Sequence, residues 1–132
     1  MPPRTPAVPV TLDAIELRVL QIPLVSPFTT SFGTEIVREV IVVRAETADG
    51  VGWGEVVTQA EPFYSSEYTQ GAWDVLTRFL APALLARRTV APEEVAGILA
   101  PVVGHRMAKA GLELAVIDAA LRAEGRSLAQ YL

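Results

Sequence analysis

The sequence predicts an α+β domain, in which a three-stranded antiparallel sheet is followed by a helical bundle. Three observations support this fold class. Between residues 13 and 57, apolar and polar residues alternate or β-branched residues cluster, as is typical of strands. The dipeptide Asp49-Gly50, which favours tight hairpin turns, separates two of these runs. From residue 66 the apolar residues recur every three or four positions, as they do along one face of a helix.

Three strands are expected, at residues 13–22, 35–48 and 51–57. In the first run, apolar side chains alternate with charged ones, which predicts one buried face and one solvated face. The second run is rich in β-branched residues, and at its centre residues 40–43 are apolar on both faces. A strand that is covered on one side only would alternate there, so we expect a second, local cover over this part of the strand.

Glycine occupies positions 50, 52 and 54, around the start of the third strand. This spacing does not fit the G-x-G-x-x-G of dinucleotide-binding loops, and these glycines open a strand instead of leading from a strand into a helix. We therefore interpret them as a tight turn followed by a close approach of another backbone beside Trp53.

Proline residues divide the helical half of the chain. A first helix is expected from residue 66, with Ser65 or Ser66 capping its start and Pro82 ending or kinking it. Pro92 suits the first position of a second, short helix. The residues of the first helix that we expect to face the core are Tyr68, Ala72, Val75, Leu76 and Phe79.

The last helix has the clearest repeat, because its apolar residues step by three and four positions before Gly125 stops it. Asp118 and Arg122 lie four positions apart, so we expect them to form an ion pair on its surface. The side chains of this helix that we expect to face the core are Met107, Ala110, Leu114, Ile117 and Leu121.

Composition excludes several classes of function. The chain has 132 residues, the length of one ordinary domain, and a formal net charge of −4. Its longest basic run is Arg87-Arg88, so nucleic-acid binding is not expected. The chain contains no cysteine, which excludes disulfides and thiolate chemistry.

The first eleven residues are rich in proline and lack the continuous apolar run of a secretory signal. We predict that residues 1–11 form a flexible lead-in to a single domain of residues 12–132. No stretch reaches the length of a membrane span, which is about 20 apolar residues. These features predict a cytoplasmic protein with no membrane partner.

The sequence offers few candidates for catalysis or metal binding. There is no G-x-S-x-G motif, and the only histidine, His105, is expected at the entry of the last helix. Lys109, the only lysine, is expected to pair with Glu113 in solvent. For Glu55 we favour a structural role, bonded to backbone or to an arginine near the sheet end. Acids and histidines do not occur at metal-ligand spacing, so no metal site is expected in this chain.

Residues 23–34, PLVSPFTTSFGT, have the composition of a loop but contain Phe28 and Phe32. Burying one phenylalanine side chain stabilises a protein by about 1.5–3 kcal/mol, so two rings left in water would forgo a useful gain. Either the rings fold back onto the core, or they close over something else. Two prolines restrict the backbone at the entry of this segment, and Gly33 is permissive near its exit, as suits a segment that swings between two anchors.

Four stretches of the chain together resemble one known family: PLVSPFTTSFGT, REVIVVRAETADGVGWGE, EPFYSSEY and GHRMAKAGLELAVIDAALRAEGRSLAQYL. They are similar to the N-terminal capping domain of the enolase superfamily, in its mandelate racemase / muconate lactonizing enzyme-like branch. Within that branch, the likeness is to the o-succinylbenzoate synthase / N-acylamino-acid racemase group. The resemblance covers about residues 12–132, and its most specific pieces are SPFTTSFG, GWGE and HRMAKA.

The resemblance implies that the chain is the substrate-capping and specificity domain of a larger, Mg²⁺-dependent enzyme. In this family a (β/α)-barrel carries the chemistry: lysines remove and return the proton next to a carboxylate, and three acids hold the Mg²⁺ that stabilises the enolate. The chain matches no part of the barrel. We therefore expect it to contain no catalytic residues and no metal ligands, and to be inactive by itself. The parent enzyme is expected to be a dehydratase, which is a lyase, or a racemase, acting on a small carboxylate.

The resemblance also assigns two segments that close over the substrate. Residues 26–34 match the first cap segment, and residues 57–64 match the second. For Phe32, which lies nearer the second strand, a role in the core stays open. The substrate-binding residues that the resemblance implies are Phe28, Thr30, Ser31, Phe32, Gln59 and Tyr64.

Two other hypotheses stay open. One is a stand-alone α+β module that binds a ligand or a protein through residues 26–34. The other is a self-sufficient small enzyme that uses His105 and Glu55. Because residues 40–43 are apolar on both faces, we also expect the chain to self-associate or to pack on a barrel domain.

Overall fold

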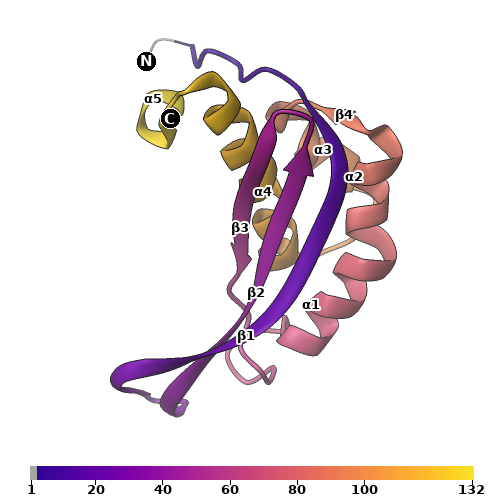
Figure 1. Ribbon diagram of the computed structural model, residues 1–132. Coiled ribbons are helices and arrows are strands. Elements are labelled where there is room, and N and C mark those ends of the chain that lie inside the picture. Colours follow the sequence, from indigo (N-terminus) through magenta and orange to yellow (C-terminus); the bar gives the residue numbers. More distant parts are fainter. Residues whose placement is uncertain (1–2) are drawn as a thin grey trace.

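The computed structural model describes residues 3–132 and shows an antiparallel sheet with helices packed on one face (Figure 1). The strands are β1 (Val10–Thr30), β2 (Gly33–Thr47), β3 (Gly50–Val56) and β4 (Thr89–Val90), in the order β3-β2-β1-β4. The predicted α+β class is confirmed, with the sheet first and the helices after it. The short strand β4 has no signal in the sequence, because two residues cannot show a period.

β1 extends beyond the expected strand at both ends. It starts at Val10, inside the predicted lead-in, where it pairs with β4. Ala7 and Val10 are both buried, so part of this lead-in packs against the domain. The flexibility of residues 1–11 stays a prediction, and residues 1–2 lie outside the described part of the chain.

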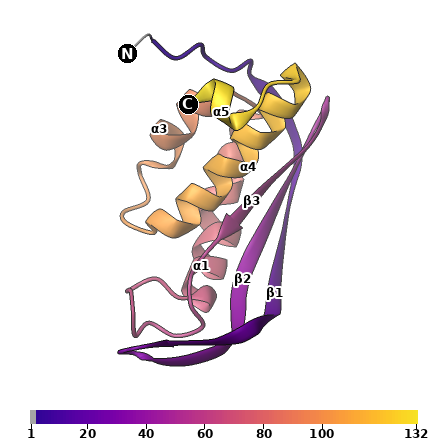
Figure 2. The ribbon, with the colours of Figure 1, turned by 90° about the vertical axis from the view of Figure 1, so that its left-hand side faces the viewer.

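The segment expected to be a loop is a β-hairpin, because β1 and β2 pair up to a turn at Ser31 and Phe32. Between Pro23 and Phe28 the register shifts, at a place where prolines lack an N–H to donate. The hairpin bends below the main sheet and runs across the end of the domain (Figure 2). Gly33 follows the turn with a φ of 138°, which glycine adopts far more readily than other residues.

The first helical stretch runs through α1 (Thr69–Val75), the π-helical segment η1 (Leu76–Leu80) and α2 (Ala81–Arg87). Pro82 does not end the helix. It lies in the first turn of α2, directly after η1, where a wider hydrogen-bond pattern accommodates its missing N–H. The predicted serine cap is also wrong, because the N-cap of α1 is Tyr68.

The remaining helical elements are η2 (Pro92–Glu94), α3 (Val95–Leu99), α4 (Arg106–Glu124) and α5 (Leu128–Tyr131). As predicted, a proline opens the short second helix, a histidine stands at the entry of the long one, and Gly125 ends it. The φ of this glycine is 63°, the left-handed conformation that commonly closes a helix.

α4 turns a different stripe toward the sheet from the one predicted. Of the five residues expected inside, only Leu121 is fully buried, while Ala110 and Leu114 are exposed. Both stripes step by three and four positions, but the stripe with smaller side chains allows the closer approach to the sheet. The buried residues of α4 are Ala108, Gly111, Leu112, Ala115, Val116, Ala119, Ala120 and Leu121.

Glycine is required where β3 meets α4. A Cβ atom placed on Gly54 would lie 2.0 Å from the carbonyl oxygen of Gly111. On Gly52 it would lie 2.1 Å from the carbonyl oxygen of Ala115. Real Cβ atoms do not approach other atoms this closely, so the prediction of a close backbone approach at the β3 glycines is confirmed.

The core lies between the sheet and the helices. Val40, Ile41 and Val43 are at most 1% exposed, although neighbours in a strand point to opposite faces. The expected local cover over this part of β2 is found, because Val40 is buried. Residues 40–43 therefore do not form the exposed apolar surface on which we based the expectation of self-association. Exposed apolar side chains gather instead on the β1–β2 hairpin and beside α4.

Candidate functional site

The two cap segments lie at one end of the domain. The first, residues 26–34, is the tip of the β1–β2 hairpin, and the second, residues 57–64, leaves the end of β3. Figure 2 shows the hairpin beneath the loop that precedes α1. Phe28 and Phe32 are 59% and 64% exposed, so neither ring belongs to the core of this domain.

The second cap segment is fastened at its base. Thr58 is buried, and its hydroxyl lies 3.3 Å from the hydroxyl of Thr69. The backbone N–H and the hydroxyl of Thr69 both donate to the carbonyl of Gln59, at 2.8 and 3.1 Å. These bonds satisfy polar groups that the fold buries. Beyond this base the segment is open, and Phe63 and Tyr64 are exposed.

Two adjoining cavities, of about 670 and 210 Å³, lie between the cap segments. Ser31 lies in the hairpin turn and lines neither cavity. The structure therefore brings together five of the six residues that the resemblance implied, from segments about thirty positions apart. Those that line the larger cavity are Phe28, Thr30, Phe32, Gln59 and Tyr64.

An aromatic contact joins the two segments across the cavity mouth. The rings of Phe32 and Tyr64 meet edge to face, with centroids 5.7 Å apart. The Thr30 hydroxyl accepts the N–H of Phe32 at 3.2 Å, which holds the turn. Its own proton remains free to be donated to a bound molecule.

Two charged residues line the larger cavity as well, Glu35 and Arg38. Arg38 donates from Nη2 to the carbonyl of Val57 at 2.6 Å, and its Nη1 lies 3.9 Å from a carboxylate oxygen of Glu35. Sequence reasoning missed both residues. The available signal was a pair of opposite charges three positions apart at the start of a strand, which is common on solvated surfaces.

Glu67 caps α4 from outside the helix. Its carboxylate accepts the backbone N–H of Met107, at 2.9 and 3.1 Å, and that of Ala108, at 3.3 Å. His105, the N-cap residue, makes no side-chain cap bond itself. A carboxylate at a helix N-terminus satisfies free N–H groups and offsets the helix dipole. This contact anchors the chain just after the second cap segment to the longest helix.

The remaining candidates from the sequence lie elsewhere. Glu55 is exposed and forms no hydrogen bond or ion pair among the described residues, so the structural role expected for it is wrong. His105 lines neither the cavities of the cap segments nor the cavity beside Glu55. Lys109 donates to the carbonyl of Val102 instead of pairing with Glu113.

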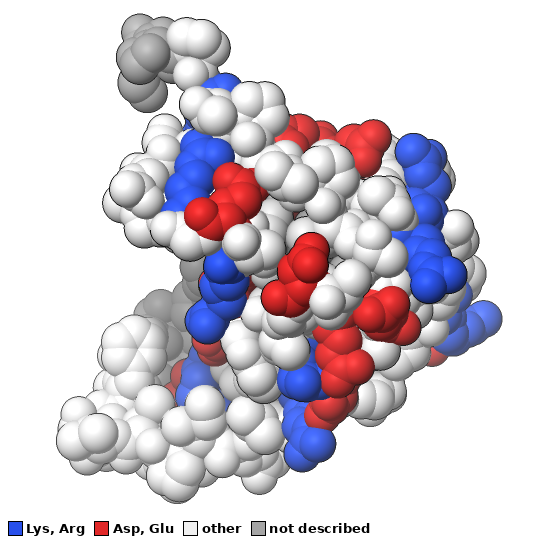
Figure 3. Space-filling view, turned by 45° about the horizontal axis from the view of Figure 1, so that its top comes forward, with Lys and Arg blue, Asp and Glu red and all other residues white. Residues whose placement is uncertain are grey.

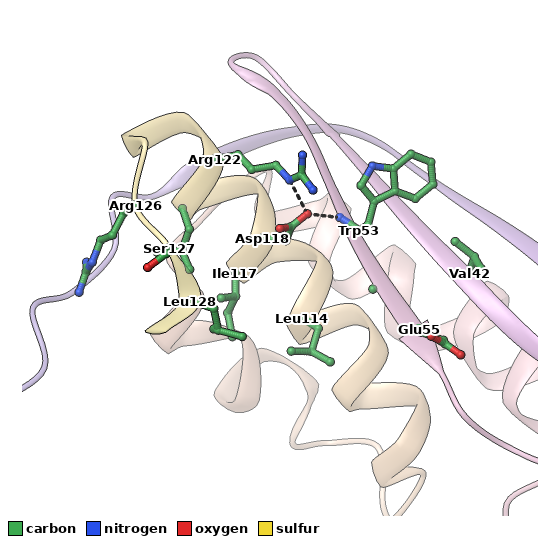
Figure 4. A pocket seen from close by; sticks show the side chains of 12 residues that line it. Val42, Trp53, Glu55, Leu114, Ile117, Asp118, Arg122, Arg126, Ser127 and Leu128 are labelled. Atoms are coloured by element: carbon green, nitrogen blue, oxygen red, sulfur yellow. Dashed lines mark hydrogen bonds and ion pairs between the residues drawn. The ribbon is translucent and has the colours of Figure 1, made fainter. Parts of the chain in front are cut away.

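A separate cavity of about 590 Å³ lies between β3 and α4 (Figure 4). Leu114 and Leu128 line it together with Trp53, and none of the implied substrate-binding residues does. Asp118 accepts the backbone N–H of Trp53 and the Nε–H of Arg122, both at 2.8 Å. The predicted ion pair of Asp118 with Arg122 is thus confirmed. The same carboxylate also accepts a backbone N–H of β3, which is an edge strand of the sheet.

Neither a broad basic patch nor a cluster of metal ligands is found on the described residues. In Figure 3 acidic groups lie toward the middle of one face, with basic groups on both sides of them. Among the described residues in this view, the basic groups do not form the broad continuous patch that nucleic-acid binding needs. Residues 3–132 contain no group of three or more histidine or acidic side chains placed to hold a metal ion. Over the same residues, no helix is both long and apolar enough to cross a membrane.

Comparison with known proteins identifies the family. Residues 14–132 match the N-terminal domain of the mandelate racemase / muconate lactonizing enzyme family. The match covers most of the chain, so the protein belongs to this family, a branch of the enolase superfamily.

Individual relatives agree with this assignment. The chain is 55% identical to an N-succinylamino acid racemase of Amycolatopsis sp. over 92% of its length, and 41% identical to an o-succinylbenzoate synthase of Geobacillus stearothermophilus over 93%. A crystal structure of an enolase-superfamily member from Listeria innocua superposes on 92% of the chain with a TM-score of 0.84 and 32% identity, and the chain covers 33% of that structure. The chain spans about a third of the length of these curated relatives.

Proposed function

We propose that this chain is the substrate-capping and specificity domain of an enzyme of the N-succinylamino acid racemase / o-succinylbenzoate synthase type. The observation that carries the proposal is the cavity between the cap segments. Five residues implied by the family resemblance line it, and they come from two separate parts of the chain. The names of the relatives and their identity to this chain support the type of enzyme.

The residues of this chain are suited to closing over a ligand. The exposed rings of Phe28, Phe32 and Tyr64 offer apolar surface that gains from being covered. The Thr30 hydroxyl and the Gln59 amide offer hydrogen bonds to polar groups of a substrate. A cap of this kind excludes water and completes a binding site, while the bonds that break lie on the other side of the substrate.

The acid–base and metal chemistry would belong to a barrel domain in the parent enzyme. Removal of a proton next to a carboxylate leaves an enolate, and Mg²⁺ stabilises its charge when bound. The described residues contain no cluster suited to that metal, and Lys109 is engaged at the start of α4. In this proposal the domain thus contributes binding and specificity, and the chain by itself has no activity.

Racemisation and dehydration begin with the same proton removal, so the proposal covers both. It is tested with the barrel-bearing protein that carries this domain, using N-succinylphenylglycine in D₂O with Mg²⁺. NMR should show exchange of the α-proton for deuterium, while the 132-residue chain at equal concentration should show none. Absence of exchange with this substrate, together with no dehydration of the o-succinylbenzoate precursor by the same barrel-bearing protein, would contradict the proposed type of enzyme.

A further inference from the structure

We propose that Arg38 is a positioning residue that joins the two cap segments into one unit. The consequence for turnover rests on the proposed function, but the joining itself does not. Arg38 lies on β2, beyond the first cap segment, and reaches toward the start of the second. It lines both the 670 Å³ cavity between the segments and a small cavity of about 60 Å³ that Glu67 and Met107 also line.

The base of the joint is a hydrogen bond at the end of the sheet. Pairing between β2 and β3 stops at Ile41 and Val56, so the next carbonyl, that of Val57, is outside the ladder. Arg38 Nη2 donates to this carbonyl at 2.6 Å. The side chain therefore continues the β2–β3 connection into the second cap segment. Among the described residues, this is the only hydrogen bond between residues 24–38 and residues 57–64.

The same guanidinium faces the first cap segment. Its Nη1 lies 3.9 Å from Glu35, and Glu35 pairs with Phe28 across the hairpin. The side chains of Arg38 and Glu35 are about 30% exposed, so solvent screens their attraction only in part. A planar guanidinium has several N–H donors in a fixed arrangement, so it can face a carbonyl and a carboxylate at the same time. A lysine ammonium on its flexible stem does this less well.

The tip of the joint is the edge-to-face contact of Phe32 with Tyr64. The two segments are thus in contact at the base and at the tip, and the cavity lies between these two contacts. Both contacts hold the same pair of segments together. Loss of either one should therefore weaken the other. In this proposal the two segments therefore form a single lid and do not move independently.

The matched control for Arg38 is Arg44. It stands on the same strand and the same face, six positions away, with 28% of its side chain exposed against 30% for Arg38. Its partners are Glu16, Glu46 and the ring of Trp53, none of them in a cap segment. Replacing either arginine by glutamine removes one charge from the same surface, so only the contact with the second segment differs.

Hydrogen–deuterium exchange in the 132-residue chain measures the joint directly. Arg38→Gln should speed amide exchange in residues 28–35 and in residues 57–64 by about tenfold, as expected for loss of one charged hydrogen bond. Arg44→Gln should leave both segments unchanged, and Arg38→Lys, which keeps a donor, should fall in between. Equal exchange in Arg38→Gln and the parent chain would overturn the proposal, as would acceleration confined to residues 57–64.

A double variant tests whether the segments form one unit. Phe32→Ala should speed exchange in both segments, and adding Arg38→Gln to it should produce less than the product of the two single effects. Simple multiplication of the two effects would show independent flaps and would contradict the joint.

Kinetics of the barrel-bearing protein separate this inference from the proposed function. With N-succinylphenylglycine, Arg38→Gln should lower kcat/KM by about tenfold, Arg38→Lys should recover part of that loss, and Arg44→Gln should match the parent. If neither this substrate nor the o-succinylbenzoate precursor is turned over, the proposed function fails while the amide-exchange result still stands. Unchanged kcat/KM with accelerated exchange would show that the joint has no part in turnover.

Discussion

Phe28 is large and apolar, yet little of the domain surrounds it. Its side chain is 59% exposed, so removing the ring from the 132-residue chain should leave no new cavity in the core. We expect Phe28→Ala to change the free energy of unfolding by less than about 0.5 kcal/mol, as most surface substitutions do. Urea unfolding followed by circular dichroism provides the measurement.

The control for Phe28 is a residue of similar character inside the core. Leu84 is fully buried, and Leu84→Ala should lower the free energy of unfolding by about 2–5 kcal/mol. If Phe28→Ala destabilises the chain as much as Leu84→Ala does, the ring belongs to the core in solution and its assignment to the cap is wrong.

Gly54 has the opposite environment, because even one added methyl group has no room. Its Cβ would meet the carbonyl oxygen of Gly111 at 2.0 Å, and backbone cannot move away as a flexible side chain can. We expect Gly54→Ala to destabilise the domain by about 3 kcal/mol or more, the upper range for overpacking. Thermal unfolding of the purified chain tests this.

The comparison for Gly54→Ala is Gly97→Ala. Gly97 lies in α3, and nothing comes within 4 Å of the position of its Cβ. Alanine favours a helix over glycine, so this variant should be as stable as the parent or more stable by up to about 1 kcal/mol. Equal stability of both alanine variants would show that β3 and α4 are not in close contact.

At the scale of elements, α4 depends on an acid that is distant in sequence. Glu67 accepts N–H groups from the first turn of the helix across about forty positions. Glu67→Ala should lower the free energy of unfolding by about 1–2 kcal/mol, as loss of a good N-cap does. Glu61→Ala removes an exposed acid from the same stretch of chain and should have an effect within about 0.5 kcal/mol. Similar losses in the two variants would argue against a cap by Glu67.

A second long-range contact makes stability depend on pH. Glu93 of η2 accepts the N–H of Ala7 at 3.1 Å and the hydroxyl of Tyr131 at 3.0 Å. Burial by itself would raise the pKa of Glu93, but these hydrogen bonds and the charge of Arg126 outweigh it and hold the pKa below the ordinary 4.5. A lowered pKa in the folded state gives stability that is present above pH 4.5 and is lost as the pH falls through the folded value.

Urea midpoints measured between pH 7 and pH 3 test the contact of Glu93. At pH 7 the parent chain should be more stable than Glu93→Gln, and the difference should shrink as the pH falls below 4.5. Burial and the bond to Glu93 raise the pKa of Tyr131 above its ordinary 10, so its contribution should be present below pH 10 and be lost as the pH rises through the raised value of the folded state. A constant difference between parent and Glu93→Gln over the whole range would contradict this interpretation.

The elements also show what sequence patterns can and cannot predict. The centres of the three long strands, the turn at Asp49-Gly50 and the glycine end of α4 follow from local rules, and all three are found. The buried face of α4 does not, because two stripes have helical spacing and only the glycines of β3 decide which one packs. The hairpin of residues 23–34 was expected as a loop, since its prolines and hydroxyl residues mask the pairing.

For the whole molecule, the fold class and family follow from the sequence, but the site follows only in part. The residues Phe28, Thr30, Phe32, Gln59 and Tyr64 were implied by likeness to a family, and their place around one cavity depends on the bend of the hairpin. Glu35 and Arg38 were missed because a charged pair on a strand has no local feature that distinguishes a joint from a solvated surface. Self-association, packing on a barrel and a cytoplasmic location stay predictions.

The central claim is that the first cap segment closes over the substrate of a barrel enzyme. The most direct test is kcat/KM of Phe28→Ala in the barrel-bearing protein with N-succinylphenylglycine. Phe79→Ala serves as the control, since that ring is also exposed but lies on η1, outside both cap segments. Phe28→Ala should lower kcat/KM by about tenfold or more, which corresponds to about 1.4 kcal/mol, while Phe79→Ala matches the parent. Equal kcat/KM for Phe28→Ala and the parent enzyme would contradict the claim.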